Sequence, residues 1–258
     1  MKRKTIFLSI ILPVLGGCQP AGSHTPAGSV QTPAKPAATK VSEIPPPSGF
    51  SRFDGSDAGF ARWLRNIRLK KDNTVYLYDG RPKANQTAQF AVLDIPVGNR
   101  DLQQCADAVM RLRASWLYST GKLSAIRFAD NNGKNYACPP HADSLAFEKY
   151  LQTVYAYCGT LSLAKQLHPV SYNDIQPGDV LIRGGSPGHA VIVLDVAKAP
   201  HSEEKYYMLA QSYMPAQNIH ILKNPSDPEH SPWYSTNHLN DLISTPEWRF
   251  YKGDLKRW

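Results

Sequence analysis

Apolar positions recur with a helical period in several segments of the first half of the chain. In residues 101–118 they recur every three or four positions, which predicts a buried helix face made of Leu102, Cys105 or Ala106, Val109, Leu112 and Trp116. We expect Asn99 or Asp101 to cap this helix and Gly121 to end it. Three further segments, 60–67, 144–157 and 161–167, also favour helices, and the second should bury Leu145, Tyr150 or Leu151, and Val154.

Short apolar runs bounded by turn residues predict strands, mostly in the second half of the chain. Two such runs, 180–183 and 190–196, flank a Gly-Gly-Ser-Pro-Gly loop, which is typical of an antiparallel hairpin. Further strands are expected at 75–78, 90–97, 123–129, 205–212, 219–222 and 248–251. Helices followed by a series of antiparallel strands favour an α+β fold.

The N-terminus has the pattern of a secretory signal. Three positive charges in residues 1–4 precede an apolar segment that is too short to span a bilayer. The ending Leu15-Gly16-Gly17-Cys18 resembles the lipobox of bacterial lipoproteins. This resemblance implies that residues 1–17 are removed and that Cys18 carries a lipid. The alternative is an ordinary signal followed by a chance cysteine.

The composition changes twice after the signal. Residues 18–49 are rich in Pro, Ala, Ser and Thr, which predicts a disordered tether, and residues 50–258 form the expected single folded domain. By Gram-negative sorting rules, Gln19 in place of Asp implies the periplasmic face of the outer membrane. Loss of residues 1–17 lowers the net charge from +8 to +5, a balance that suits an anionic envelope better than nucleic acid.

The cysteine count leaves one thiol without a partner. If Cys18 is lipidated, Cys105, Cys138 and Cys158 remain in an oxidising compartment. We expect a possible disulfide between Cys138, in a loop, and Cys158, at a helix end. The alternative is that all three stay reduced. No spacing predicts a metal site, and no motif implies a cofactor.

The unpaired Cys105 lies in the first turn of a predicted helix, where the positive end of the macrodipole favours a thiolate. A cysteine nucleophile needs a base, and His189 at the mouth of the second hairpin strand is the natural candidate. The alternative for Cys105 is a small, inert, buried side chain.

A third residue should hold the imidazole of the base. An assumed strand register places Gln211 directly opposite His189, where its amide oxygen can accept the imidazole N–H. A slip of one residue would place Ser212 there instead. His220 is interpreted as a surface histidine on a half-buried strand, and Asp179 as a turn or cap residue.

These residues carry two resemblances. A cysteine at a helix start, a strand opened by Gly178-Asp179, the run GHAVIV at 188–193 and a polar residue on the next strand resemble NlpC-type cell-wall cysteine peptidases. The stretches DLQQCADAVMRLR, GDVLIRGGSPGHAVIVLDVA and LAQSYMPAQNIHILKNP more closely resemble an uncharacterised bacterial family, known as a domain of unknown function.

The first resemblance implies a papain-like fold, with the nucleophile helix packed on an antiparallel sheet and a Cys105–His189–Gln211 triad. Gln89 or Gln104 could supply an amide to the oxyanion. The expected function is a lipid-anchored hydrolase that cleaves an amide bond in peptidoglycan stem peptides. The alternative is a non-catalytic binding or scaffold lipoprotein on the same frame.

Overall fold

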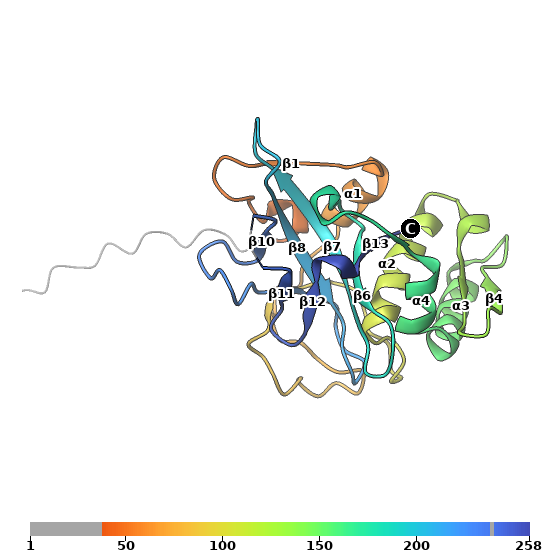
Figure 1. Ribbon diagram of the computed structural model, residues 1–258. Helices are drawn as coiled ribbons and strands as arrows, with labels where there is room; N and C mark the ends of the chain where they lie inside the picture. Colours follow the sequence, from red (N-terminus) through yellow and green to blue (C-terminus); the bar gives the residue numbers. More distant parts are fainter. Residues whose placement is uncertain (1–37, 238–239) are drawn as a thin grey trace, which may run out of the picture. The chain divides into compact units, whose positions relative to one another are not determined.

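The computed structural model describes residues 38–237 and 240–258 of the 258-residue chain. These residues form an α+β structure in which helices pack on a large antiparallel sheet, which confirms the predicted fold class (Figure 1). The predicted signal segment 1–17 and Cys18 lie outside the described residues. In the described part of the chain, no helix is long and apolar enough to cross a bilayer.

The main sheet has nine strands, paired antiparallel throughout. Seven of them follow the order β2 (Gln89–Val92), β9 (His220–Leu222), β8 (Lys205–Gln211), β7 (His189–Lys198), β6 (Val180–Arg183), β13 (Leu255–Arg257) and β5 (His168–Pro169). Two more pair beside this path, β1 (Ser51–Arg52) with β7 and β10 (Trp233–Ser235) with β8. Two small sheets complete the set: β3 (Arg127–Ala129) with β4 (Asn135–Ala137), and β11 (Leu242–Ser244) with β12 (Arg249–Tyr251).

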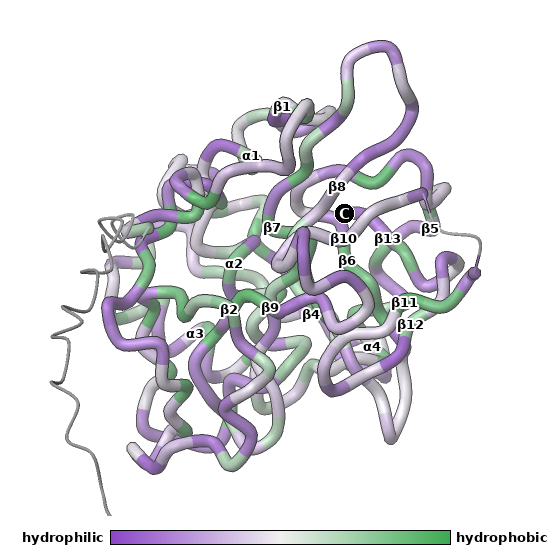
Figure 2. The backbone as a smooth tube through the Cα atoms, turned by 90° about the vertical axis from the view of Figure 1, so that its left-hand side faces the viewer, coloured by the Kyte–Doolittle hydropathy of each residue, from purple (hydrophilic) through white to green (hydrophobic). Residues whose placement is uncertain are grey.

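Four α-helices accompany the sheet, α1 (Ala58–Arg65), α2 (Cys105–Ser119), α3 (Ser144–Tyr157) and α4 (Thr160–Gln166). Short 3₁₀ turns occur at η1 (Val41–Glu43), η2 (Leu123–Ala125), η3 (Tyr172–Asp174) and η4 (Lys252–Asp254). Helices α1 and α2 pack against β7, whereas α3 packs against α2. In Figure 2 the hydrophobic segments, drawn in green, gather where α2 lies beside β7.

Strand β7 separates the two hydrophobic cores. Its residues Ala190 and Ile192 belong to the larger core under the helices, and Val191 and Val193 to the smaller core on the other face. This alternation is the period of two that a strand imposes on its side chains. A register shift between Val193 and Asp195 then reverses the parity, as a β-bulge does.

A buried ion pair fixes the outer half of β7. The fully buried carboxylate of Asp195 accepts hydrogen bonds from Arg52 Nε at 2.7 Å and Arg65 Nε at 2.6 Å. A buried carboxylate needs such partners because its desolvation is otherwise uncompensated. The residues before α1 are therefore bound to the central strand.

Several predicted elements differ from the observed ones. Helix α2 begins at Cys105 with Gln104 as its N-cap, so neither Asn99 nor Asp101 caps it. Leu145, expected on the buried stripe of α3, is 63% exposed. The predicted strand at 75–78 reduces to isolated bridges, and that at 123–129 divides into η2 and β3. Six strands of two or three residues were not predicted, namely β1, β4, β5, β10, β11 and β13.

The fold begins about ten residues before the predicted end of the tether. Val41 and Ile44 are both buried in the larger core. The prediction that residues 18–49 form a disordered tether is therefore wrong for the described residues from 38 onward. Two isolated apolar side chains were enough to anchor a stretch whose average composition is typical of disorder.

We expect Ile44→Ala to lower the free energy of unfolding by about 2–4 kcal/mol, because a buried side chain leaves a cavity when truncated. The measurement is urea unfolding followed by tryptophan fluorescence. The control is Ser48→Ala, at an exposed position of the same segment. Equal stability of both variants would show that the segment is a tether after all.

Candidate functional site

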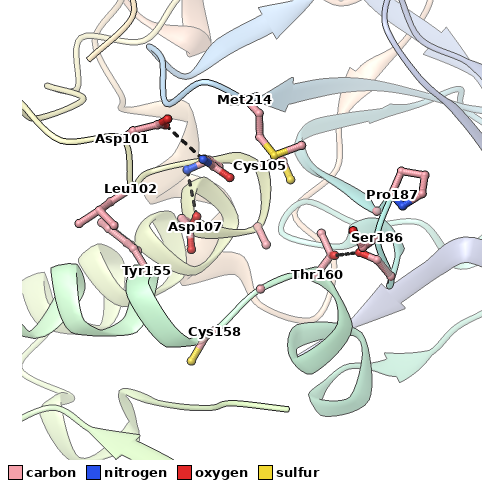
Figure 3. A pocket seen from close by; sticks show the side chains of 15 residues that line it. Asp101, Leu102, Cys105, Asp107, Tyr155, Cys158, Thr160, Ser186, Pro187 and Met214 are labelled. Atoms are coloured by element: carbon pink, nitrogen blue, oxygen red, sulfur yellow. Dashed lines mark hydrogen bonds between the residues drawn. The ribbon is translucent and has the colours of Figure 1, made fainter. Parts of the chain in front are cut away.

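The start of α2 places Cys105 beside a cavity. Gln104 caps the helix and Cys105 is its first residue, with a side chain only 6% exposed. The cavity has a volume of about 260 Å³ and is lined by α2, by the segment 158–160 and by the loop 185–188 (Figure 3). Met214 closes it from the end of β8.

The thiol adjoins the strand that carries His189. The backbone N–H of Ala190, the residue after His189, and that of Ala106 both favour negative charge on the Cys105 sulfur. The α2 start and the first residues of β7 thus meet, as a nucleophile and a base must. Among the described residues, no hydrogen bond links this thiol with the imidazole.

The ionisation state of Cys105 differs from the prediction. Burial raises the pKa of the thiol to about 11, and the nearby Asp107 carboxylate raises it further, against the backbone N–H groups. The thiol is therefore protonated at neutral pH, although the helix start was expected to favour a thiolate. The helix terminus contributes in the expected direction, but desolvation of a buried charge is the larger effect.

Gln211 is the residue that holds His189. The Nε2–H of the imidazole donates to Gln211 Oε1 at 2.8 Å, and both side chains are buried. The predicted register was wrong, since Ile192 pairs with Ala210 and Gln211 therefore falls beside Val191 rather than His189. The two side chains still meet, because diagonal neighbours on one sheet face are within reach of long side chains.

Ser212, the alternative third residue, has a structural role instead. Its hydroxyl lies between two backbone carbonyls, those of Gln103 at 3.0 Å and Gln217 at 2.9 Å. It therefore joins the loop before α2 to the loop after β8.

The amide of Gln211 is oriented by its other partners. Its Nε2 donates to Glu247 Oε2 at 2.8 Å and lies 3.3 Å from His220 Nε2. Because Nε2 faces a carboxylate, the oxygen must face His189. The amide oxygen only accepts, so His189 carries its proton on Nε2 and leaves Nδ1 as the basic atom.

Glu247 belongs to a charged cluster that the sequence did not predict. It accepts hydrogen bonds from Lys83 Nζ at 2.5 Å and Asn85 Nδ2 at 3.1 Å. Burial alone would raise the pKa of Glu247, but these contacts, chiefly with Lys83, lower it. The carboxylate is thus ionised, and Lys83 is its buried counter-ion.

His220 is another residue whose position was predicted wrongly. It is fully buried on β9, not on the surface, and its Nδ1–H donates to the Asn218 carbonyl at 2.9 Å. Its Nε2 is therefore free to accept from Gln211. The alternation of His220 with apolar neighbours predicted a strand. It did not indicate that both faces of this strand are buried, the face that carries His220 included.

Aromatic rings enclose His189. The imidazole centroid lies 4.8 Å from that of Tyr213, 5.2 Å from Trp248 and 5.9 Å from Phe250. This burial lowers the pKa of His189 to about 4, against the opposing effects of Gln211 and Glu247. Both the imidazole and the thiol are therefore neutral at neutral pH.

The structure contradicts the possible disulfide. Cys138 and Cys158 are both buried free thiols, as is Cys105. Cys138 follows β4 and packs in the larger core, whereas Cys158 ends α3 and lines the cavity in front of Cys105. Each thiol is accommodated as a small apolar side chain, so neither depends on a cross-link.

Of the remaining candidate residues, Asp179 and Gln89 have structural partners, whereas Gln104 lines the cavity. The Asp179 carboxylate accepts from the Gln176 backbone at 2.8 Å and pairs with Arg257, as a turn residue would. The Gln89 amide donates to Asn73 O, away from the cavity, whereas Gln104 lines it. The described residues contain no group of three side chains suited to a metal ion.

A protein-family model, described as domain of unknown function (4846), matches residues 41–139 and 137–257. The chain belongs to this family. The matched segments include Cys105, His189, Gln211 and Glu247, so the whole site lies within the family domain. No curated protein and no solved structure matches the chain significantly.

We expect strong energetic coupling between Lys83 and Glu247, because removing either one leaves a buried charge unpaired. Glu247→Gln should lower the free energy of unfolding by about 3 kcal/mol, and the double variant Lys83→Met/Glu247→Gln by less than the sum of the single changes. The control cycle uses the more exposed pair Asp79 and Arg81. Additive losses of unfolding free energy at both pairs would contradict the assignment of Lys83 and Glu247 as a coupled ion pair.

We expect the protein to lose stability between about pH 6.5 and about pH 4. Burial lowers the pKa of His220 to about 4 from 6.5, so within this window the unfolded chain binds a proton that the folded chain excludes. His220→Gln should therefore flatten the dependence of the unfolding free energy on pH by up to about 1.4 kcal/mol per pH unit.

Urea unfolding at a series of pH values measures this slope. The same change at exposed His141 is the control. An unchanged slope in His220→Gln, with normal folding at pH 7, would mean that the buried imidazole is not neutral.

Proposed function

We propose that the protein is a cysteine hydrolase of papain-like, NlpC-type architecture that cleaves an amide bond. The observation that carries the proposal is the His189–Gln211 hydrogen bond beside the cysteine at the start of α2. A nucleophile at a helix start, a base and a group that orients the base are the parts that such chemistry needs.

The neutral state of the site points to general-base catalysis rather than a preformed ion pair. As the Cys105 sulfur attacks the amide carbonyl, His189 Nδ1 takes the thiol proton. The imidazolium then returns this proton to the leaving amine as the C–N bond breaks, which leaves a thioester on Cys105. His189 next takes a proton from water as the water oxygen attacks the thioester carbonyl. The C–S bond then breaks, the carboxylic acid leaves, and the imidazolium returns its proton to the Cys105 sulfur.

Glu247 assists the charged stage of this cycle. Its negative charge raises the pKa of His189, although the effect of burial is larger. Gln211 is hydrogen-bonded to both groups and so holds them in this arrangement. The carboxylate therefore stabilises the imidazolium when it forms, which is the role of the acid in a catalytic triad.

Two donors are available to the oxyanion. The first N–H groups of a helix have no intrahelical partner, so the backbone of Cys105 can donate to a developing negative charge. The Gln104 amide lines the cavity and uses one N–H on Asp101 at 3.1 Å. Its second N–H is available to the substrate.

The proposed substrates are peptidoglycan stem peptides, and the proposed location is the periplasmic face of the outer membrane. The lipobox-like Leu15-Gly16-Gly17-Cys18 supports the location, and the resemblance to cell-wall peptidases supports the substrate. The cavity volume of about 260 Å³ suits a small peptide side chain better than a large ligand.

One observation favours a second candidate, a non-catalytic binding lipoprotein. The Cys105 thiol is buried and its pKa is raised to about 11. An inert thiol in a peptide-binding cleft would have these properties.

Incubation of purified peptidoglycan with wild type and with Cys105→Ala separates the two candidates. We expect new peptide fragments from wild type, identified by mass spectrometry, and a loss of at least about 10³-fold in Cys105→Ala. Gln211→Ala should lower kcat by about 10–100-fold, because the imidazole loses its orientation.

Cys138→Ala is the matched control, since it removes a buried thiol outside the cavity. Identical products from wild type and Cys105→Ala would contradict a hydrolase, and retained binding of both to peptidoglycan would then favour the second candidate.

A further inference from the structure

The cavity in front of Cys105 contains a carboxyl group with an unused oxygen. Asp107 is 5% exposed and lies two residues after Cys105 on α2. Its Oδ2 accepts the backbone N–H of Gln104 at 2.9 Å, whereas Oδ1 is buried without a hydrogen-bond partner (Figure 3). The capping role therefore explains only one of the two oxygens.

A second unpaired group lines the same cavity. The hydroxyl of Tyr155, from α3, is buried without a hydrogen-bond partner. Leaving a buried polar atom unsatisfied costs about 1–3 kcal/mol, and more when the atom belongs to a charged group. Two such atoms on residues that line the same cavity as Cys105 indicate that a ligand completes their hydrogen bonds.

The charges around the cavity define the chemistry of that ligand. Its lining residues include two acids, Asp101 and Asp107, and no lysine or arginine. The Asp101 carboxylate already has partners, the Gln104 amide at 3.1 Å and the Ala216 N–H at 2.7 Å. The unused oxygen of Asp107 therefore favours a ligand that brings both N–H donors and a positive charge.

We propose that Asp107 binds a protonated primary amine of the substrate, next to the amide bond that Cys105 attacks. This assignment rests on the proposed hydrolase function for the identity of the substrate. The amine donates to Asp107 Oδ1, and the Tyr155 hydroxyl adds a further acceptor at the cavity wall.

Such binding would also activate the nucleophile. Burial raises the pKa of the Asp107 carboxyl, and its negative charge in turn raises the pKa of the Cys105 thiol. A bound ammonium stabilises the carboxylate and cancels its effect on the sulfur. A substrate with a free amine is then held in place, and the Cys105 thiol beside it has a lower pKa and is more reactive.

Thiol modification tests the amine site without any need for hydrolysis. Full-length protein is treated with 2-aminoethyl methanethiosulfonate, which is cationic, or with neutral methyl methanethiosulfonate. In each case the Cys105 sulfur attacks the thiosulfonate sulfur, a disulfide forms and methanesulfinate leaves. Mass spectrometry of the Cys105 peptide gives both rates, each divided by the rate with free N-acetylcysteine.

We expect wild type to favour the cationic reagent by about tenfold, an effect expected of one ion pair in a partly buried site. The preference should grow as the pH rises through the carboxyl pKa. Asp107→Asn keeps an acceptor for the Gln104 N–H and should reduce the ratio to about one, while exposed Asp101→Asn should leave most of it. An unchanged ratio in Asp107→Asn, or an equal fall in both variants, would overturn the proposal.

A peptide pair separates this outcome from failure of the hydrolase. Two substrates that differ only in acetylation of the amine should be cleaved at different rates by wild type and at similar rates by Asp107→Asn. Cleavage of neither peptide, with the reagent preference intact, would reject the hydrolase and keep the amine site. Equal cleavage of both by wild type, with no reagent preference, would reject the amine site alone.

Discussion

The site depends on the orientation of one side-chain amide. Gln211 donates to Glu247 and contacts His220 on one side, and on the other it accepts from His189. If the Gln211 amide could rotate by 180°, it would present either its oxygen or its NH₂ group to His189. Only the oxygen, which accepts the Nε2–H, leaves Nδ1 as the basic nitrogen. The buried charge of Glu247, balanced by Lys83, selects the orientation. A charged pair remote from the thiol thus decides which nitrogen of the imidazole is the base.

The remainder of the fold brings the two halves of the site together. Helix α2 supplies the cysteine and packs on β7, which begins with the histidine. Asp195 binds β7 to Arg52 and Arg65, so the strand cannot shift along its axis without breaking a buried ion pair. The geometry at one end of β7 is therefore supported by an electrostatic contact at the other.

The sequence predicts those parts of the site that have a local pattern. The helical period located Cys105 near a helix start, and the glycine-rich hairpin located His189 at a strand start. Gln211 was chosen for its chemistry from a register that proved wrong, because alternation alone does not fix where the β7–β8 hairpin closes, which is at Lys198 and Lys205. Lys83 and Glu247 lie in irregular segments 164 residues apart, and nothing local signals that they pair. Asp107 received no role from the sequence, because one acidic residue in a helix has no local pattern that signals an unpaired oxygen.

The protonated state of Cys105 has a consequence for its chemical lifetime. Peroxides and other oxidants attack the thiolate, which passes through a sulfenic acid to forms that cannot be reduced again. A thiol whose pKa is about 11 exists almost entirely as the resistant S–H form, and burial adds a steric barrier. A reduced cysteine with these properties resists oxidation even in an oxidising compartment. The low reactivity of the buried, protonated thiol is thus a form of protection.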